Sequence, residues 1–317
     1  MINRVLLYNS GGGVGDAIQI LPLINTLKTN FKNAKFFYLC AHQNHFNSTL
    51  SDFDCRIDSL DFGIKYFGFR WWHALIIRSK IKKYNIETFD LIIDLQSKIR
   101  NSLILKIIPH KYFISTCMNF KLSRPSLYIK KQKNINNTIL SAINYILGTN
   151  LQLNEYNINK IDKKFFIESE KLLPKNNYVG FSITQGNIYR KKEWPLSNIV
   201  KLCNKLVQNN KTPVFFIIRK NHELKNKIKN LIPSALFPEH ETNLSSSALV
   251  TCLGKRLDFA ISIDNGVMHM LSLSKVPMIS LFGPTDSEKF APDYKDSIVL
   301  DSKKLYNTKN ISAITVE

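Results

Sequence analysis

Short apolar segments alternate with longer amphipathic segments along the whole chain. The first of them, residues 4–9, is a short apolar run ended by glycines, which is typical of a strand buried on both faces of a parallel sheet. The expected strands cover residues 4–9, 35–40, 89–96, 178–183, 213–218, 259–264 and 276–283.

The segments between these strands have the apolar spacing of helices. After the first strand, Ile20, Leu23, Ile24 and Leu27 form a helical stripe. Further helices are expected within residues 70–86, 129–148, 195–210 and 266–274, the second of them ending at Gly148. Strands that alternate with helices predict open α/β sheets.

The alternation is interrupted by a weakly hydrophobic stretch over residues 154–177. A chain of 317 residues suggests two domains of roughly 150 residues each. We therefore predict an N-terminal domain over residues 1–165 and a C-terminal domain over 166–317, with the last helix a candidate to pack back on the first domain. Each sheet is expected to bind ligands at the carboxyl ends of its strands, and two such ends that face each other form a cleft.

The chain is strongly basic, with a formal net charge of +20 and an apolar fraction of 44%. This charge favours an acidic partner, such as nucleic acid, an anionic membrane surface or a phosphorylated substrate. Because the charge is spread along the chain, solvated lysines without a ligand are the alternative.

Cysteine usage and the N-terminal residues bear on the compartment. The five cysteines are odd in number and no pair has metal-ligand spacing, which favours a reduced, cytoplasmic environment. Residues 1–13 are too short and too soon rich in glycine for a signal peptide. No run of 18 apolar residues exists, so a membrane contact is expected to be peripheral.

The first candidate motif is the glycine-rich turn before Asp16. Gly11 and Gly13 resemble the start of a dinucleotide fingerprint, but Asp16 stands close to where the third glycine belongs, and no acid follows the second strand. NAD binding is therefore disfavoured. A helix N-cap is the simple alternative for Asp16, and a cap would also place its carboxylate at the mouth of a cleft.

The second candidate motif precedes a helix that starts near Trp194 and Pro195. Arg190, Lys191 and Lys192 lie just before it, and cations beside a helix N-terminus form an anion site suited to a diphosphate. The alternative is a basic loop without a ligand.

The third candidate motif follows the strand at 259–264. Asn265 and Gly266 form a tight turn after Asp264, and His269 lies in the first turn of the next helix. The N-terminus of this helix is able to bind phosphate oxygens. A helix-packing histidine and an N-cap aspartate are the alternatives.

Taken together, these motifs resemble those of glycosyltransferase family 9, the bacterial heptosyltransferases. The segments that carry the resemblance are GGGVGDAIQILPLINTLK, FDLIIDLQ, RKKEWP, DNGVMHMLSLSKVPMISLFGPTD and FAPD. The resemblance implies two Rossmann-like domains facing across a cleft (the GT-B architecture). It also implies inverting transfer from a nucleotide sugar, typically ADP-heptose, to the acidic inner core of lipopolysaccharide, with neither a metal nor a cofactor.

The resemblance implies a role for individual residues. Asp16 matches the family's general base, which takes the proton of the acceptor hydroxyl. Lys192 matches the lysine that contacts the phosphates and stabilises the departing diphosphate. The donor and phosphate candidates are Thr184, Gln185, Gly186, Lys191, Lys192, Asp264, Asn265, Gly266 and His269.

This chain departs from the family on the donor side. The family often has Pro-Gly-Ala at residues 184–186, threonine where Asn265 stands, and a small polar residue in place of Met268. A different nucleotide-activated sugar is therefore an alternative donor.

The acceptor candidates are Gly15, Lys65, Arg70 and Gln96. Trp71, Trp72 and the basic residues of the helix at 70–86 are suited to acidic sugars or to the cytoplasmic face of the inner membrane. The alternative is a helix whose tryptophans pack inward and whose lysines face water.

Two other classes of function compete with glycosyl transfer. A basic nucleic-acid-binding protein fits the charge, but the basic residues form no aromatic-interleaved recognition motif, and no nucleic-acid partner is expected. A catalytically silent sugar-nucleotide binder is disfavoured because Asp16 is retained.

Overall fold

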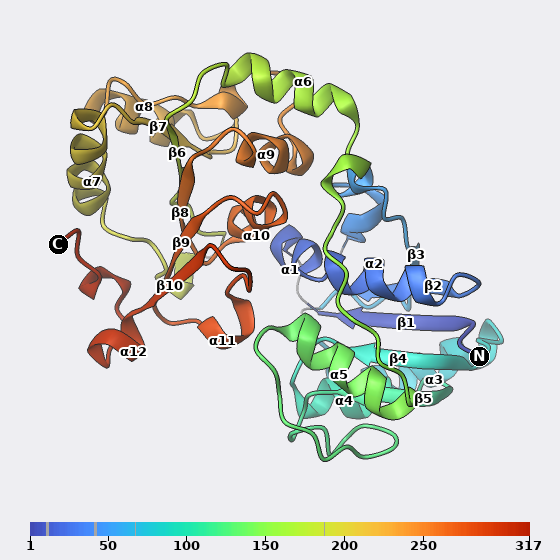
Figure 1. Cartoon of the computed structure of the whole chain (residues 1–317). Coiled ribbons are helices and arrows are strands. Elements are labelled where there is room, and N and C mark those ends of the chain that lie inside the picture. The colour runs from blue at the N-terminus through green and yellow to red at the C-terminus, as the bar shows by residue number, and fades with distance from the viewer. Residues whose placement is uncertain (11–12, 41–42, 67, 187) are drawn as a thin grey trace. The chain divides into compact units, whose positions relative to one another are not determined.

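The computed structural model describes residues 1–10, 13–40, 43–66, 68–186 and 188–317, apart from the side chain of Ile188. Gly11 of the predicted glycine-rich turn lies outside the described residues. The chain divides into two units, Met1–Tyr156 and Asn157–Glu317 (Figure 1). The division lies inside the weakly hydrophobic stretch but before residue 165, because helix α6 (Lys163–Leu172) packs against helix α9 (Ser247–Gly254) of the second unit.

The first unit is built on a five-stranded parallel sheet in the order β3-β2-β1-β4-β5. The strands β1, β2 and β4 coincide with strands expected from the apolar runs, whereas β3 and β5 were not predicted. Their bounds are β1 (Arg4–Asn9), β2 (Lys35–Cys40), β3 (Asp58–Ser59), β4 (Phe89–Asp94) and β5 (His110–Ser115).

Helices cover both faces of this sheet. Leu6 and Tyr8 of β1 share a core cluster with Ile77 of α3 and Ile104 of α4, while α2 packs against α5. Helix α5 ends at Gly148, whose left-handed conformation (φ 62°) terminates the helix as predicted. The helices are α1 (Val14–Gln19), α2 (Leu21–Asn30), α3 (His73–Lys83), α4 (Ile99–Leu105) and α5 (Ile135–Leu147).

The second unit repeats this plan with the sheet order β10-β9-β8-β6-β7. A parallel bridge between Val214 and Leu236 extends the sheet by one further short position beyond β7. The strands β6 to β9 match predicted strands, and β10 was not predicted. Their bounds are β6 (Tyr178–Ser182), β7 (Thr212–Phe215), β8 (Phe259–Ile263), β9 (Met278–Phe282) and β10 (Ser297–Asp301).

Helices α7 and α8 pack on one face of the second sheet, together with Ile311 and Ile314 near the C-terminus. The indole Nε1 of Trp194 donates to the carbonyl of Ile314 at 2.8 Å, so the C-terminal segment lies on the core of the second unit. The remaining helices are α7 (Leu196–Gln208), α8 (His222–Leu231), α10 (Gly266–Leu273), α11 (Ser287–Phe290) and α12 (Ser302–Tyr306). Short 3-10 turns occupy His45–Asn47, Ser51–Phe53, Ile158–Lys160, Ile188–Arg190, Pro238–His240 and Ile311–Ala313.

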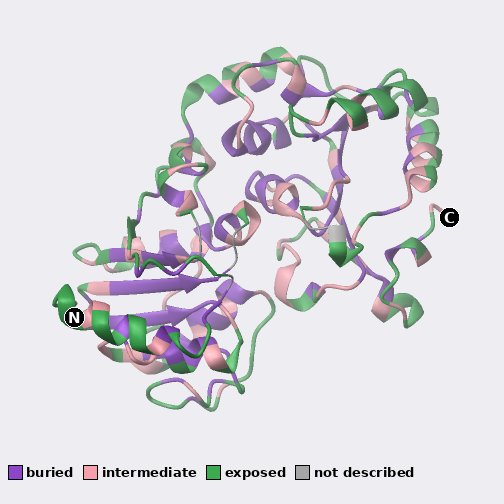
Figure 2. Cartoon of the chain, turned by 180° about the vertical axis from the view of Figure 1, so that it is seen from behind, coloured by how far each residue is buried: buried purple, intermediate pink, exposed green. Residues whose placement is uncertain are grey.

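The strands of both sheets are largely buried, whereas the outer faces of the surrounding helices are exposed (Figure 2). The prediction of two Rossmann-like α/β domains is confirmed. In each sheet the chain reverses its direction of winding beside the first strand, between β1 and β4 and between β6 and β8. Parallel sheets bind ligands outside the carboxyl ends of the strands at this position. Across the described residues, no helix has the length and apolar character needed to span a bilayer.

Candidate functional site

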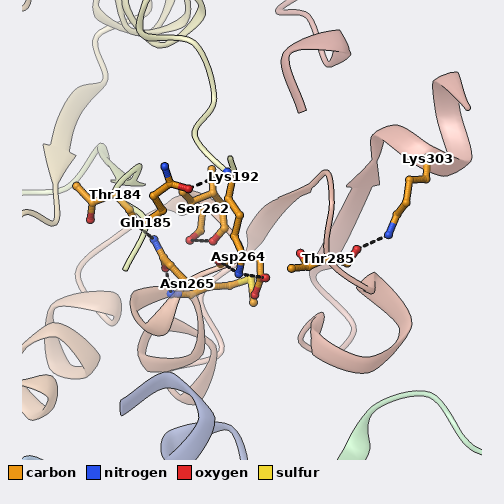
Figure 3. A network of polar contacts seen from close by, with 10 residues as sticks. Thr184, Gln185, Lys192, Ser262, Asp264, Asn265, Thr285 and Lys303 are labelled. Atoms are coloured by element: carbon orange, nitrogen blue, oxygen red, sulfur yellow. Dashed lines mark hydrogen bonds and ion pairs between the residues drawn. The ribbon is translucent and has the colours of Figure 1, made fainter. Parts of the chain in front are cut away.

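In the second unit, Asn265 ties together the two loops at the winding reversal (Figure 3). It follows the end of β8 and caps α10, because its Oδ1 accepts a hydrogen bond from the backbone N–H of Met268 at 2.9 Å. Its Nδ2 donates to Ser182 Oγ at 2.7 Å and to the carbonyl of Thr184 at 2.8 Å. One amide therefore holds the loop after β6 against the start of α10.

Lys192 brings a fixed positive charge to the same place. Its ammonium group forms an ion pair with the Asp264 carboxylate and donates to the Asp264 carbonyl at 3.1 Å (Figure 3). The two side chains are only 11% and 8% exposed. The backbone N–H of Lys192 donates to Gln185 Oε1 at 2.8 Å, which holds the basic segment against the loop after β6.

An ammonium group has three protons, and Asp264 accepts two of them. The third is available to an anion that approaches the N-terminus of α10, whose backbone N–H groups also favour negative charge. The ion pair keeps the cation in one position before any ligand arrives. Removing one partner of such a buried pair leaves the other charge uncompensated.

His269 is buried inside α10, with 6% of its surface exposed. The pKa of its imidazole is lowered to about 4, mainly by burial; Asp264 opposes this decrease and Lys192 adds to it. The ring is therefore neutral at pH 7 and brings no positive charge to this end of the sheet. Its burial matches the helix-packing alternative, and a contact with the donor remains a prediction.

The structure brings most of the predicted donor residues together. Thr184, Gln185, Lys192, Asp264 and Asn265 form one hydrogen-bonded group, and Gly266 is the first residue of α10. Gly186 and Lys191 are exposed on the adjoining loop. A Cβ added at Gly186 meets no atom within 4 Å, so the surrounding protein leaves the backbone open there.

Three polar groups at the same sheet edge were missed in the sequence. Lys303 of α12 donates to the carbonyl of Thr285, in the turn after β9 (Figure 3). Arg219, after β7, donates to Asn243 Oδ1 at 2.7 Å. Glu239 lies beyond the short Leu236 bridge, and burial raises the pKa of its carboxyl to about 7 while a hydrogen bond from Ser245 lowers it.

Only one of these groups had a recognisable signal. Arg219 directly follows the predicted strand at 213–218, where ligand contacts are expected. Glu239 follows a bridge that is a single residue long, which leaves no apolar run to recognise. Lys303 lies in α12, directly after β10, a strand that the apolar pattern did not predict.

In the first unit, the structure places Asp16 in the first turn of α1, together with Gly15. The N-cap is Gly13, which makes no side-chain cap hydrogen bond, so the interpretation of Asp16 as the cap itself is wrong. A Cβ added at Gly13 would lie 3.7 Å from Asp16 Oδ2, which shows that the half-buried carboxylate turns back toward the glycine-rich turn.

Gln96 occupies the winding reversal of the first unit. Its Nε2 donates to Asn9 Oδ1 at 2.7 Å, and its backbone N–H donates to Asp94 Oδ1 at 2.9 Å. Asp94 is fully buried and also accepts hydrogen bonds from Ser102 Oγ and Ser115 Oγ at 2.6 and 2.9 Å. The carboxyl ends of β1 and β4 are thus joined through Gln96.

The remaining acceptor candidates, Lys65 and Arg70, are exposed on the segment that leads into α3. The backbone N–H of Arg70 donates to His73 Nδ1 at 3.0 Å, which fixes the start of the helix. Trp71 and Trp72 are 59% and 57% exposed, so the alternative in which these tryptophans pack inward is wrong.

In the part of the chain that the structure describes, no group of three or more His, Cys, Asp or Glu side chains lies together. The charged candidates are a carboxylate, Asp16, at the first winding reversal and an ammonium group, Lys192, beside a helix N-terminus at the second.

Comparison with known proteins reveals consistent similarities. Residues 77–316 match the sequence profile of glycosyltransferase family 9 (heptosyltransferase). Lipopolysaccharide heptosyltransferase 1 of Campylobacter coli is 21% identical over 238 residues, which cover 70% of each chain.

Solved structures with the same fold include a family 9 glycosyltransferase from Veillonella parvula, with a TM-score of 0.67 and 16% identity over 99% of this chain and 94% of that one. The Escherichia coli heptosyltransferase WaaC with ADP has a TM-score of 0.64 and 16% identity over 98% of this chain and 96% of that one. The E. coli ADP-heptose lipopolysaccharide heptosyltransferase II has a TM-score of 0.64 and 15% identity over 98% and 97%. At these identities the structures establish the common fold.

Proposed function

The chain belongs to glycosyltransferase family 9 (heptosyltransferase), and from this premise we propose that it transfers heptose from ADP-heptose to an acidic inner-core lipopolysaccharide or a related surface glycan. The observation that carries the proposal is the ion pair of Lys192 with Asp264 beside the capped N-terminus of α10. This arrangement suits a nucleoside diphosphate, because it joins one fixed cation to free backbone N–H groups.

The donor side of the proposal places the diphosphate at the winding reversal of the second unit. One E. coli relative was solved with ADP and another time with ADP-2-deoxy-2-fluoro heptose. As the bond between the anomeric carbon and the diphosphate oxygen breaks, ADP leaves with the electron pair and gains negative charge. Lys192 and the N-terminus of α10 stabilise that charge, and no cofactor takes part.

The acceptor side of the proposal assigns the general base to Asp16. An acceptor hydroxyl attacks the anomeric carbon from the face opposite the diphosphate and passes its proton to the carboxylate, so the configuration inverts. In this proposal the first unit supplies the base and the second unit holds the donor. Gly15, next to Asp16 in α1, and Gln96, at the winding reversal of the first unit, belong to the proposed acceptor site, as do the exposed Lys65 and Arg70.

The acceptor class also suggests where the enzyme works. An inner-core glycolipid is anchored in a bilayer, and we place the reaction at the cytoplasmic face of the inner membrane with the enzyme in peripheral contact. A second candidate donor is another nucleotide-activated sugar, which the departures at residues 184–186 and at Asn265 favour. Both readings keep the same catalytic residues.

The test is a product assay with a panel of nucleotide sugars and a truncated lipopolysaccharide acceptor. We expect ADP-heptose to give ADP and an acceptor one heptose heavier by mass spectrometry. Transfer from a different nucleotide sugar alone would support the second candidate. Thermal shift provides an independent measurement, and stabilisation by oligonucleotides but by no nucleotide sugar would contradict both readings.

A further inference from the structure

The helix α3 has apolar side chains on its outer side as well as on its inner side. His73 and Ile77 are buried in the core of the first unit. On the outer side, Trp71, Trp72 and Leu75 are 59%, 57% and 68% exposed. Ile76 beside them is 37% exposed, so four large apolar residues face solvent within six positions. Contiguous exposed apolar side chains of this kind usually mark a contact surface.

The same segment is uniformly basic. Its cationic residues are Lys65, Arg70, Arg78, Lys80, Lys82 and Lys83. Residues 62–86 contain neither aspartate nor glutamate, so no local acid offsets this charge. At the C-terminal end of α3, the ammonium groups of Lys80 and Lys83 lie 5.4 and 5.6 Å from the ring of Tyr84. Aromatic and aliphatic side chains flanked by Lys and Arg are the composition of surfaces that lie on anionic membranes.

The start of this helix is anchored at the ligand-binding edge of the first sheet. The ring of Phe69 stacks on Tyr8 of β1 at 5.0 Å, and the backbone N–H of Phe69 donates to Asn101 Oδ1 at 2.9 Å. Tyr8 directly precedes Asn9, the partner of Gln96. Trp71 and Trp72 therefore follow immediately after the point where the chain is fixed beside the carboxyl end of β1.

We propose that the outer face of α3, formed by Trp71, Trp72, Leu75, Ile76, Lys82 and Lys83, docks on the surface of an anionic lipid bilayer. The indole rings and the aliphatic side chains enter the interfacial layer, and the lysines contact lipid headgroups. Near an anionic leaflet each basic side chain adds to the attraction, so several together give reversible binding that weakens with salt.

Other occupants explain less of this face. A nucleic acid or an acidic glycan satisfies the cations but offers nothing to Leu75 and Ile76, whose aliphatic groups stay in water. An anionic bilayer accommodates both the apolar and the basic side chains of this face. Docking here would place the carboxyl edge of β1 close to the membrane, where a lipid-linked acceptor is found. The docking itself does not depend on the sugar-transfer reaction.

The experiment is co-sedimentation of the full chain with vesicles of neutral phosphatidylcholine or of phosphatidylcholine with about a third phosphatidylglycerol, without donor or acceptor. We expect binding to the anionic vesicles that declines steeply as salt rises. Lys82→Glu with Lys83→Glu is expected to weaken it by about tenfold or more. Leu75→Ser with Ile76→Ser is expected to weaken it several-fold and to leave transfer to a soluble, delipidated acceptor unchanged.

The matched control reverses two exposed lysines of the second unit, Lys205→Glu with Lys227→Glu, which changes the net charge equally. An equal loss of vesicle binding in this control would overturn the docking face, because net charge alone would then explain the binding. Equal binding of the parent protein to neutral vesicles, or binding to oligonucleotides in place of vesicles, would also overturn it. If vesicles bind as expected but no sugar is transferred, the proposed reaction fails and the docking face stands.

Discussion

In the first unit the loop after β1 leads to the carboxylate of Asp16, whereas in the second unit the loop after β6 leads to the ammonium group of Lys192. Both groups lie beyond the first strand of a parallel sheet, beside the winding reversal. The sheets share their topology, but the charge placed at this point has opposite sign. In the proposed reaction, the same fold thus provides a proton acceptor in one unit and an anion site in the other.

The two reversals also share a structural device. In the first unit the amide of Gln96, after β4, reaches Asn9 at the end of β1. In the second, the amide of Asn265, after β8, reaches Ser182 and the carbonyl of Thr184 at the end of β6. A neutral amide therefore joins equivalent strand ends in each unit, and we propose that the nearby charged residue, Asp16 or Lys192, sets the role of that unit.

The largest effect is expected from removing the charge of the first unit. Asp16→Asn keeps the size of the side chain but removes the proton acceptor, so turnover is expected to fall by about 10²–10⁴-fold. Donor binding, measured by calorimetry with ADP, is expected to stay within about twofold, because the proposed diphosphate site lies in the second unit. A parallel loss of ADP affinity would instead make Asp16 a structural residue. It would contradict the proposal that the base and the donor site lie in different units.

A smaller effect is expected at the charge of the second unit. Lys192→Ala is expected to lower kcat/KM by about 10²-fold and to weaken ADP binding, because a donor to the leaving diphosphate is lost. It also leaves Asp264 buried without its cation, which destabilises the fold by about 3 kcal/mol or more. Lys191→Ala, on the exposed neighbouring residue, is the control and should change both quantities only slightly.

The buried ion pair makes a second variant informative. Adding Asp264→Asn to Lys192→Ala removes the uncompensated charge, so the melting temperature is expected to recover. The affinity for ADP should stay low, since the cation is still absent. If ADP affinity recovers together with stability, Lys192 serves only to neutralise Asp264, and the diphosphate is bound elsewhere.

The parts of the fold that sequence alone revealed are those with continuous apolar runs. β1, β4, β6 and β8 are buried on both faces, and each is predominantly apolar. β3 is only two exposed residues long, and the adjacent Ile298 and Val299 of β10 are exposed at the edge of its sheet, so neither strand is buried on both faces.

The candidate site divides in a similar way. Lys192, Asp264 and Asn265 were recognisable because each follows a strand or precedes a helix, where ligand contacts gather. The contacts between these residues were not recognisable, because Lys192 and Asp264 lie 72 residues apart in the sequence. The inward packing considered for Trp71 and Trp72 failed because α3 already fills its inner side with His73 and Ile77.

The smallest expected effects concern the two amides, and they test whether the reversals are equivalent. Asn265→Ser retains a residue that caps α10 well but removes both donations from Nδ2, so it separates the cap from the tie to the loop after β6. We expect the KM for the donor to rise by a few-fold up to about tenfold, with little change in melting temperature. Asn265→Ala loses the cap as well and should also cost about 1 kcal/mol of stability.

Gln96→Ala is the matching change in the first unit, since it removes the hydrogen bond to Asn9 and leaves the backbone contact with Asp94 in place. We expect it to raise the KM for the acceptor to a similar extent and to leave the KM for the donor unchanged. Steady-state kinetics with each substrate varied in turn measure both constants. The amide of Gln96 contacts residues of the first unit, and the amide of Asn265 contacts residues of the second unit. If Gln96→Ala changes the KM for the donor, or Asn265→Ser changes the KM for the acceptor, the two units do not each bind one substrate.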